Sequence, residues 1–94
     1  MSKLEDDHFT CAAMISAADR LAGIGKLSAD AFSADKTLPA SMGHLNAWAI
    51  PKGLKEAEAF AAVNKEREQL LADLAPEEIG SRAQACIASM KSST

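Results

Sequence analysis

Aromatic residues are scarce in this chain, which has three Phe, one Trp and no Tyr among 94 residues. Alanine is abundant instead, in runs such as CAAMISAA and AEAFAAV. Alanine favours helices and lets them approach closely, but it buries little apolar area. We therefore expect one domain with a thin core, because a chain of this length has material for a single core. A thin core leaves apolar surface to cover, so we also expect a homodimer.

Signals for strands, membrane spans and export are also lacking. No segment alternates apolar and polar residues, and Val and Thr are few, so no sheet is predicted. No uncharged apolar stretch approaches the roughly 18 residues of a membrane span. The opening MSKLEDD lacks the basic and apolar regions of a signal peptide. Two cysteines are too few for a disulfide framework, so we expect a cytoplasmic protein with reduced, buried thiols.

Apolar residues at three- and four-residue spacing run through most of the chain and predict helices. Ser28 is a typical N-cap, Pro39 and Pro76 suit first helical turns, and Pro51 is expected to end a helix. The predicted helices cover residues 3–23, 28–34, 38–49, 54–74 and 76–90. The predicted fold is all-α, a small bundle of four to five helices in a single domain.

One aromatic residue falls in each of the first four predicted helices, at Phe9, Phe32, Trp48 and Phe60. We expect these four side chains to meet in a shared core. Arg67 interrupts the apolar stripe of the fourth predicted helix. Either its stem lies along the core while the guanidinium reaches water, or the helix leaves the body of the protein at this turn.

His8 and Cys11 lie three residues apart on a predicted helix, and His44 and Cys86 would complete a two-Cys, two-His zinc set. Zinc modules usually bring their ligands in close pairs, however, and two of these four stand alone. Cys11 as a nucleophile with His8 as its base would lack an acid or amide to orient the histidine. We therefore predict no metal, no cofactor, no catalytic residues and no enzyme activity, and keep a small metal or thiol site as the third hypothesis.

Residues 28–49 have the proportions of a helix-turn-helix: a short helix, a turn at ADKT, and a longer helix that carries His44 and Asn46. Lys36 and Lys52 flank the longer helix. Against DNA binding, that helix has no Arg, and the whole chain is acidic, with a net charge of −3. A DNA-binding regulator that uses residues 28–49 is the alternative hypothesis, although the charge argues against nucleic acid as a partner.

Residues 36–55 contain no Asp or Glu, in a chain that has 13 of them. This window also holds Trp48, a large amphipathic side chain of the kind that dominates protein interfaces. We predict a non-enzymatic protein–protein interaction module: an inhibitor, an adaptor or a small regulator, of the type that phages and plasmids encode. The predicted partner-binding residues are Lys36, Met42, His44, Asn46, Trp48, Lys52, Lys55 and Arg67.

Overall fold

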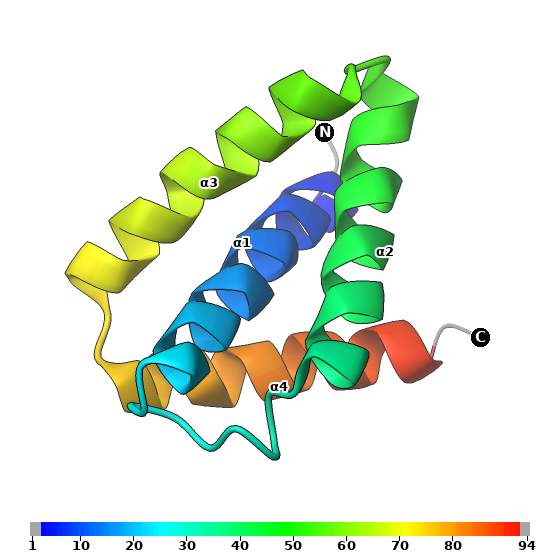
Figure 1. Ribbon diagram of the computed structural model, residues 1–94. Coiled ribbons are helices and arrows are strands. Elements are labelled where there is room, and N and C mark those ends of the chain that lie inside the picture. Colours follow the sequence, from blue (N-terminus) through cyan, green and yellow to red (C-terminus); the bar gives the residue numbers. More distant parts are fainter. Residues whose placement is uncertain (1–2, 93–94) are drawn as a thin grey trace.

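Four helices make up the part of the chain that the computed structural model describes, residues 3–92, with side chains described for residues 8–89 (Figure 1). They are α1 (Lys3–Gly23), α2 (Ala34–Lys52), α3 (Glu56–Asp73) and α4 (Pro76–Ser92). No strand occurs in this part, so the predicted all-α bundle is confirmed. Within the same residues, none of the helices combines the length and the apolar character that crossing a membrane requires.

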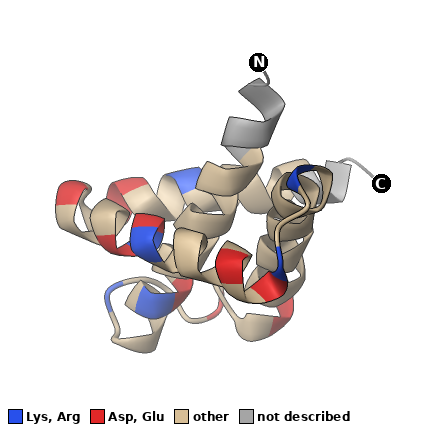
Figure 2. Cartoon of the chain, turned by 90° about the horizontal axis from the view of Figure 1, so that it is seen from above, with Lys and Arg blue, Asp and Glu red and all other residues tan. Residues whose placement is uncertain are grey.

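Helix α1 is the centre of the bundle and packs against each of the other three helices. It is buried from Ala12 to Ile15 and again at Ala17 and Ala18. Among the residues that Figure 2 draws in colour, the charged ones lie on the other helices and loops and near the C-terminal end of α1, while the middle of α1 carries none. Helices α2 and α3 meet at the turn that joins them and then diverge, so that α1 lies between them (Figure 1). This divergence creates the groove described below.

The core consists of two clusters rather than one. The first joins α1 and α4 and includes the buried side chains of Met14, Ile15, Leu21, Phe32 and Ile79. The second joins α1, α2 and α3 and includes Ala12, Ala13, Leu45, Ala49, Ala59 and Val63. The predicted shared core of four aromatics is therefore wrong. Phe32 belongs to the first cluster, and Phe9 and Trp48 pack on the second, whereas Phe60 is exposed because α3 diverges from α2.

The predicted helix over 28–34 is wrong, because this segment forms turns rather than a helix. The side-chain oxygen of Ser28 accepts a hydrogen bond from the amide of Ala31 at 3.3 Å, and its carbonyl accepts one from the amide of Phe32 at 3.1 Å. These bonds close a single turn. Phe32 is nevertheless buried, as expected, and anchors the connection to the first core cluster.

Helix α2 begins four residues earlier than predicted, so the ADKT segment is its first turn. The carbonyl of Ser33 accepts hydrogen bonds from the amides of Lys36 and Thr37, both at 2.9 Å. The hydroxyl of Thr37 also donates to the Oδ1 atom of Asp19 at 3.2 Å, which ties this turn to α1. Residues 28–49 therefore do not form a helix-turn-helix, and the DNA-binding alternative loses the layout on which it depends.

Helix α2 continues through Pro51 and ends at Lys52, with Gly53 as its C-cap, although Pro51 was expected to end it. Gly53 has a φ of 70°, in the left-handed region, and its amide donates to the carbonyl of Ile50 at 3.0 Å. The amide of Leu54 donates to the carbonyl of Ala49 at 3.2 Å, which completes a common helix-ending turn. This turn fixes the direction in which α3 leaves α2.

Replacing Gly53 with alanine is expected to lower the free energy of unfolding by about 1 kcal/mol, because a Cβ atom disfavours a left-handed backbone. Gly23→Ala is the matched control. Gly23 ends α1 without a positive φ, and no heavy atom lies within 4 Å of the position of an added Cβ. Urea unfolding of the two variants checks the expectation, and equal stabilities would contradict the role given to Gly53.

Candidate protein-binding groove

A groove runs along α2 and α3, and α1 forms the floor of its first part. It consists of two adjoining pockets of about 190 and 210 Å³, and Met42 and Leu45 line both of them. The first pocket has Ala12, Ile15 and Ser16 of α1 below it. The second continues along α2 to the turn that joins α2 to α3. We call the two together the α2–α3 groove.

Large apolar side chains stand exposed along this groove. Leu38 and Phe60, which are 62% and 38% exposed, line the first pocket, and Ile50, 71% exposed, lines the second. The fourth exposed large apolar residue of the described part, Ile24 at 61%, lies elsewhere. This set was not predicted from the sequence, since Phe60 was expected in the core and neither Leu38 nor Ile50 was among the predicted partner-binding residues.

The charged residues that line the α2–α3 groove in the described part of the chain are both acidic. Asp19 lies in the first pocket, and Glu56 lies in the second, near the turn between α2 and α3. Asp19 is exposed and accepts the hydrogen bond from Thr37. The rest of the lining is apolar, apart from Ser, Thr and Asn side chains.

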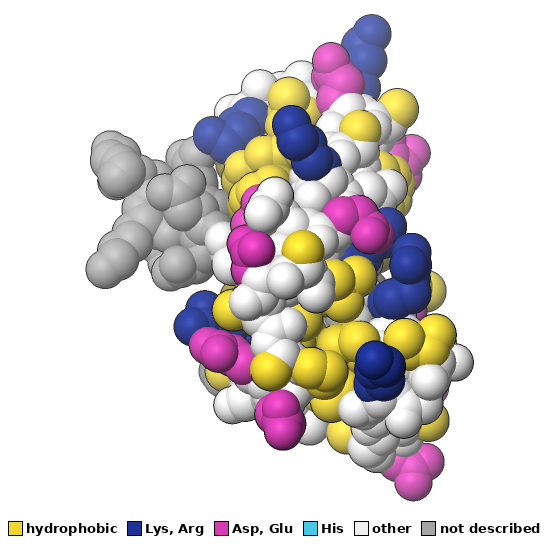
Figure 3. Space-filling view, turned by 90° about the vertical axis from the view of Figure 1, so that its left-hand side faces the viewer, with side chains coloured by type: hydrophobic (Ala, Val, Ile, Leu, Met, Phe, Trp, Pro, Cys, Tyr) yellow, Lys and Arg dark blue, Asp and Glu magenta, His cyan; other side chains and the backbone are white. Residues whose placement is uncertain are grey.

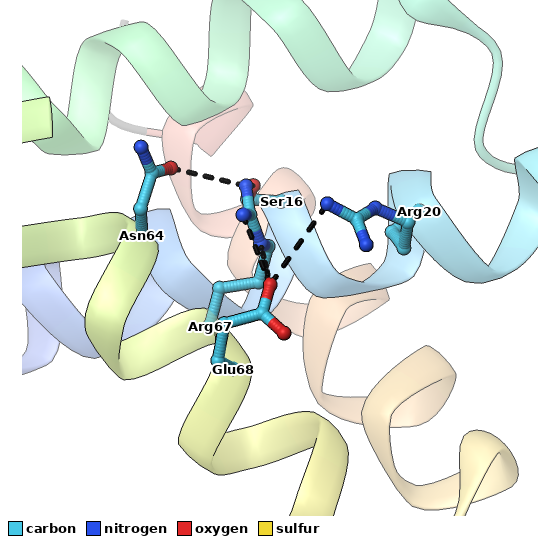
Figure 4. Close-up of polar contacts among 5 residues, drawn as sticks. All are labelled: Ser16, Arg20, Asn64, Arg67 and Glu68. Carbon is cyan, nitrogen blue, oxygen red and sulfur yellow. Dashed lines mark hydrogen bonds and ion pairs between the residues drawn. The ribbon is translucent and has the colours of Figure 1, made fainter. Parts of the chain in front are cut away.

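Arg67 holds α3 against α1 beside this groove (Figure 4). Its guanidinium donates to the Oδ1 atom of Asn64 at 3.0 Å and to the hydroxyl of Ser16 on α1 at 3.4 Å. It also pairs with Glu68 at 3.0 Å, and Arg20 of α1 approaches the same carboxylate at 3.8 Å. Arg67 is therefore engaged within the protein, with its side chain half-buried, and helix α3 does not leave the body at this turn.

The structure brings only part of the predicted partner-binding set to the groove. Met42 and Asn46 line it, and Lys52 and Lys55 lie exposed where α2 ends and α3 begins. Lys36 lies on the side of α2 that faces α4 and donates to the carbonyl of Asp30 at 3.0 Å. The acid-free window therefore spans several faces of α2 rather than one surface.

Two other members of the predicted set lie away from the groove. His44 is 2% exposed, so its side chain lies in the interior and not on the surface where the sequence analysis expected a partner. Trp48 is half-buried, and its ring packs against Phe9 of α1 with ring centroids 4.6 Å apart. Trp48 is thus neither a central core residue nor a freely exposed one.

Free thiols were expected from the sequence, and this expectation is wrong. Cys11 of α1 and Cys86 of α4 form a disulfide. Their Cα atoms lie 5.4 Å apart, across a sequence separation of 75 residues. The two positions face each other because α1 and α4 pack together. The spacing of the cysteines along the chain does not indicate this packing. The disulfide also removes the basis for expecting a reducing cytoplasm, since that expectation depended on reduced thiols.

The two histidines lie beside the disulfide and contact each other. The Nδ1 atoms of His8 and His44 are 2.8 Å apart, and the Nε2 atom of His44 lies 2.9 Å from the carbonyl oxygen of Cys86. Burial lowers the pKa of His44 below 6.5, and the neighbouring His8 lowers it further, against an opposing effect of the bond to Cys86. All four residues of the third hypothesis therefore converge at one place where α1, α2 and α4 meet.

This convergence does not make a metal site in the disulfide form. In the part of the chain with described side chains, no group of three or more His, Cys, Asp or Glu residues is placed to hold a metal ion. The disulfide engages both sulfur atoms, which leaves the two imidazoles as the polar groups of this cluster.

A second apolar patch lies where α1 ends, α3 ends and α4 begins. In Figure 3, which views the molecule from the left-hand side of Figure 1, the patch appears as apolar side chains in the lower part of the view, with basic side chains beside them. It is a shallow pocket of about 350 Å³ lined by Arg20, Leu21, Ile24, Lys26, Leu71, Leu74, Pro76 and Ile79. Ile24 is its one strongly exposed large apolar side chain, so it offers fewer anchors than the α2–α3 groove.

Comparisons of the chain with protein-family models, with curated proteins and with solved structures found no match.

Proposed function

We propose that the protein is a non-enzymatic interaction module, an inhibitor or adaptor, that binds an amphipathic helix of another protein in the α2–α3 groove. One observation carries the proposal. Three of the four large apolar side chains that are exposed in the described part line this groove, namely Leu38, Ile50 and Phe60. Amphipathic helices bind in such grooves by inserting apolar anchors spaced three and four residues apart.

The acidic residues of the groove indicate which charges the bound helix carries beside its apolar anchors. Asp19 and Glu56 lie in different pockets of the groove, so both ends present a carboxylate to a ligand. The partner helix is therefore expected to carry apolar anchors on one face and Lys or Arg beside them. Charge complementarity of this kind raises the association rate and selects the orientation of the partner.

Leu38→Glu is expected to weaken binding of the partner by about tenfold or more, because it puts a charge where an apolar anchor docks. Ile24→Glu is the matched control, since Ile24 is 61% exposed against 62% for Leu38 but lies outside the groove. The partner is captured with the wild-type protein, identified, and titrated with all three proteins. Equal weakening by both substitutions, or by neither, would contradict the proposed groove.

The partner that occupies the groove could be a second copy of the same chain, and this case can be tested separately. A homodimer is predicted from the thin core, and light scattering of the wild-type protein, Leu38→Glu and Ile24→Glu tests that prediction. A dimer that only Leu38→Glu converts to monomer would place the self-association in the groove. A monomeric wild-type protein would leave the groove for a different protein.

We also infer that the protein acts in an oxidising compartment rather than in the cytoplasm. The inference depends on the Cys11–Cys86 disulfide, because such bonds persist where thiols are not kept reduced. The thiol state of the protein taken from its cells tests this inference.

A further inference from the structure

The hydrogen bonds of His44 fix the protons of both histidines. A carbonyl oxygen only accepts, so the Nε2 atom of His44 must carry the hydrogen that binds the carbonyl of Cys86, 2.9 Å away. In the neutral ring this leaves Nδ1 of His44 as an acceptor. The Nδ1 atom of His8, 2.8 Å away, must then carry a hydrogen and donate it.

This arrangement accepts one added proton but not two. The first can bind the Nε2 atom of His8, a half-buried residue, and both hydrogen bonds remain. A second proton must go to Nδ1 of His44, where it points at the N–H group of His8. The two charged rings would then face each other with centroids 5.0 Å apart, so their contact must open.

No carboxylate among the described side chains next to the pair offsets this second charge. Residues 40–48 of α2 and 83–89 of α4, around His44 and Cys86, contain no charged residue, and neither do residues 9–18 of α1. The buried residues that α3 contributes to the second core cluster, on which Phe9 and Trp48 pack, are the uncharged Ala59 and Val63. Glu5, Asp6 and Asp7 precede His8 in the sequence, and their side chains lie outside the described residues.

The pKa of His44 is lowered, which agrees with the closed pair resisting a second proton. Burial disfavours its charged form, so the separated state binds more protons than the closed state as the pH falls below 6.5. The closed pair is therefore most stable above that pH, and its stability is lost as the pH falls toward the lowered pKa of His44.

We propose that the His8–His44 pair is a latch that holds the start of α1 against α2 and α4 near neutral pH and opens in mild acid. The disulfide at Cys11, three residues after His8, keeps the rest of α1 attached to α4, so the opening is local and reversible. Phe9 follows His8 and packs on Trp48, which lies one turn after His44 on α2. Opening therefore uncovers an apolar surface, Phe9 with Trp48, that is separate from the α2–α3 groove.

Trp48 is the only tryptophan and reports the opening directly. Its fluorescence and its quenching by acrylamide are followed from about pH 7.5 to about pH 5, above the range in which carboxylates titrate. The wild-type protein, with its disulfide intact, is expected to show a red shift and stronger quenching with a midpoint below 6.5, while its far-UV circular dichroism stays unchanged. No change over this range, or loss of helix together with the red shift, would overturn the latch.

His8→Asn distinguishes the latch from general acid sensitivity. The side-chain amide of Asn reaches the position of Nδ1 of His8. Its NH2 group can donate to neutral His44, and its oxygen can accept from protonated His44. The midpoint is therefore expected to fall by about one pH unit or more. An unchanged midpoint would overturn the proposal. Should His8→Asn not fold, the imidazole NMR signals of the wild-type protein decide, because His44 must titrate with the midpoint shown by Trp48.

Discussion

Removing the Cys11–Cys86 disulfide is expected to lower the free energy of unfolding by about 4 kcal/mol. The bond joins residues 75 positions apart, so it constrains most of the unfolded chain, and the entropic benefit of a disulfide grows with that length. A loss of this size is a large part of the total stability of a small domain. The melting temperature of a Cys11→Ala, Cys86→Ala variant should fall by about 20 °C relative to the wild-type protein.

Reduction provides the control for that variant. A dithiol reductant should lower the melting temperature of the wild-type protein by a similar amount and leave the double variant unchanged, because the variant has no disulfide to lose. Alkylation of the protein taken directly from cells should find neither thiol free if the compartment is oxidising. A wild-type protein that melts at the same temperature with and without reductant would contradict a stabilising role for the bond.

Local signals predicted the bounds of the first helix well, but they failed at the turn over 28–34 and at both ends of α2. The helix over 3–23 has the predicted bounds, because its apolar spacing and the glycines after it are properties of the segment itself. Ser28 carries an equally typical N-cap signal but closes only one turn. The start of α2 was misplaced because the bond from Thr37 to Asp19 lies between segments that are distant in the sequence.

The candidate site was much less predictable than the fold. The acid-free window led to Met42 and Asn46, which line the groove, but also to His44, which is buried. The groove exists because α2 and α3 diverge over α1, and that divergence depends on packing between helices rather than on the pattern within one. The exposure of Phe60 also depends on packing between helices, because its spacing within α3 suits a core position although the side chain is exposed. Pairing of the two cysteines likewise requires the arrangement of α1 and α4.

Ala13→Leu is expected to lower the free energy of unfolding by about 3 kcal/mol. Ala13 is completely buried in the second core cluster, where α1 meets α2 and α3 beside Leu45 and Ala59. Leucine is nearly as good a helix former as alanine, so the loss would report packing rather than helix propensity. The larger side chain has no space there and must push α2 or α3 away from the floor helix. Thermal and urea unfolding measure the effect.

Ala72→Leu is the matched control, because Ala72 lies on the exposed side of α3 and the same change there should shift the free energy of unfolding by no more than about 0.5 kcal/mol. A large loss at Ala13 alone would show that close approach to α1 requires alanine in its middle turns. It would also explain how a chain so poor in aromatic residues folds around a thin core, because small side chains on α1 let the other three helices pack closely against it. If Ala13→Leu were as stable as Ala72→Leu, α2 and α3 would be free to move apart, and the shape of the α2–α3 groove would be adjustable rather than fixed by α1.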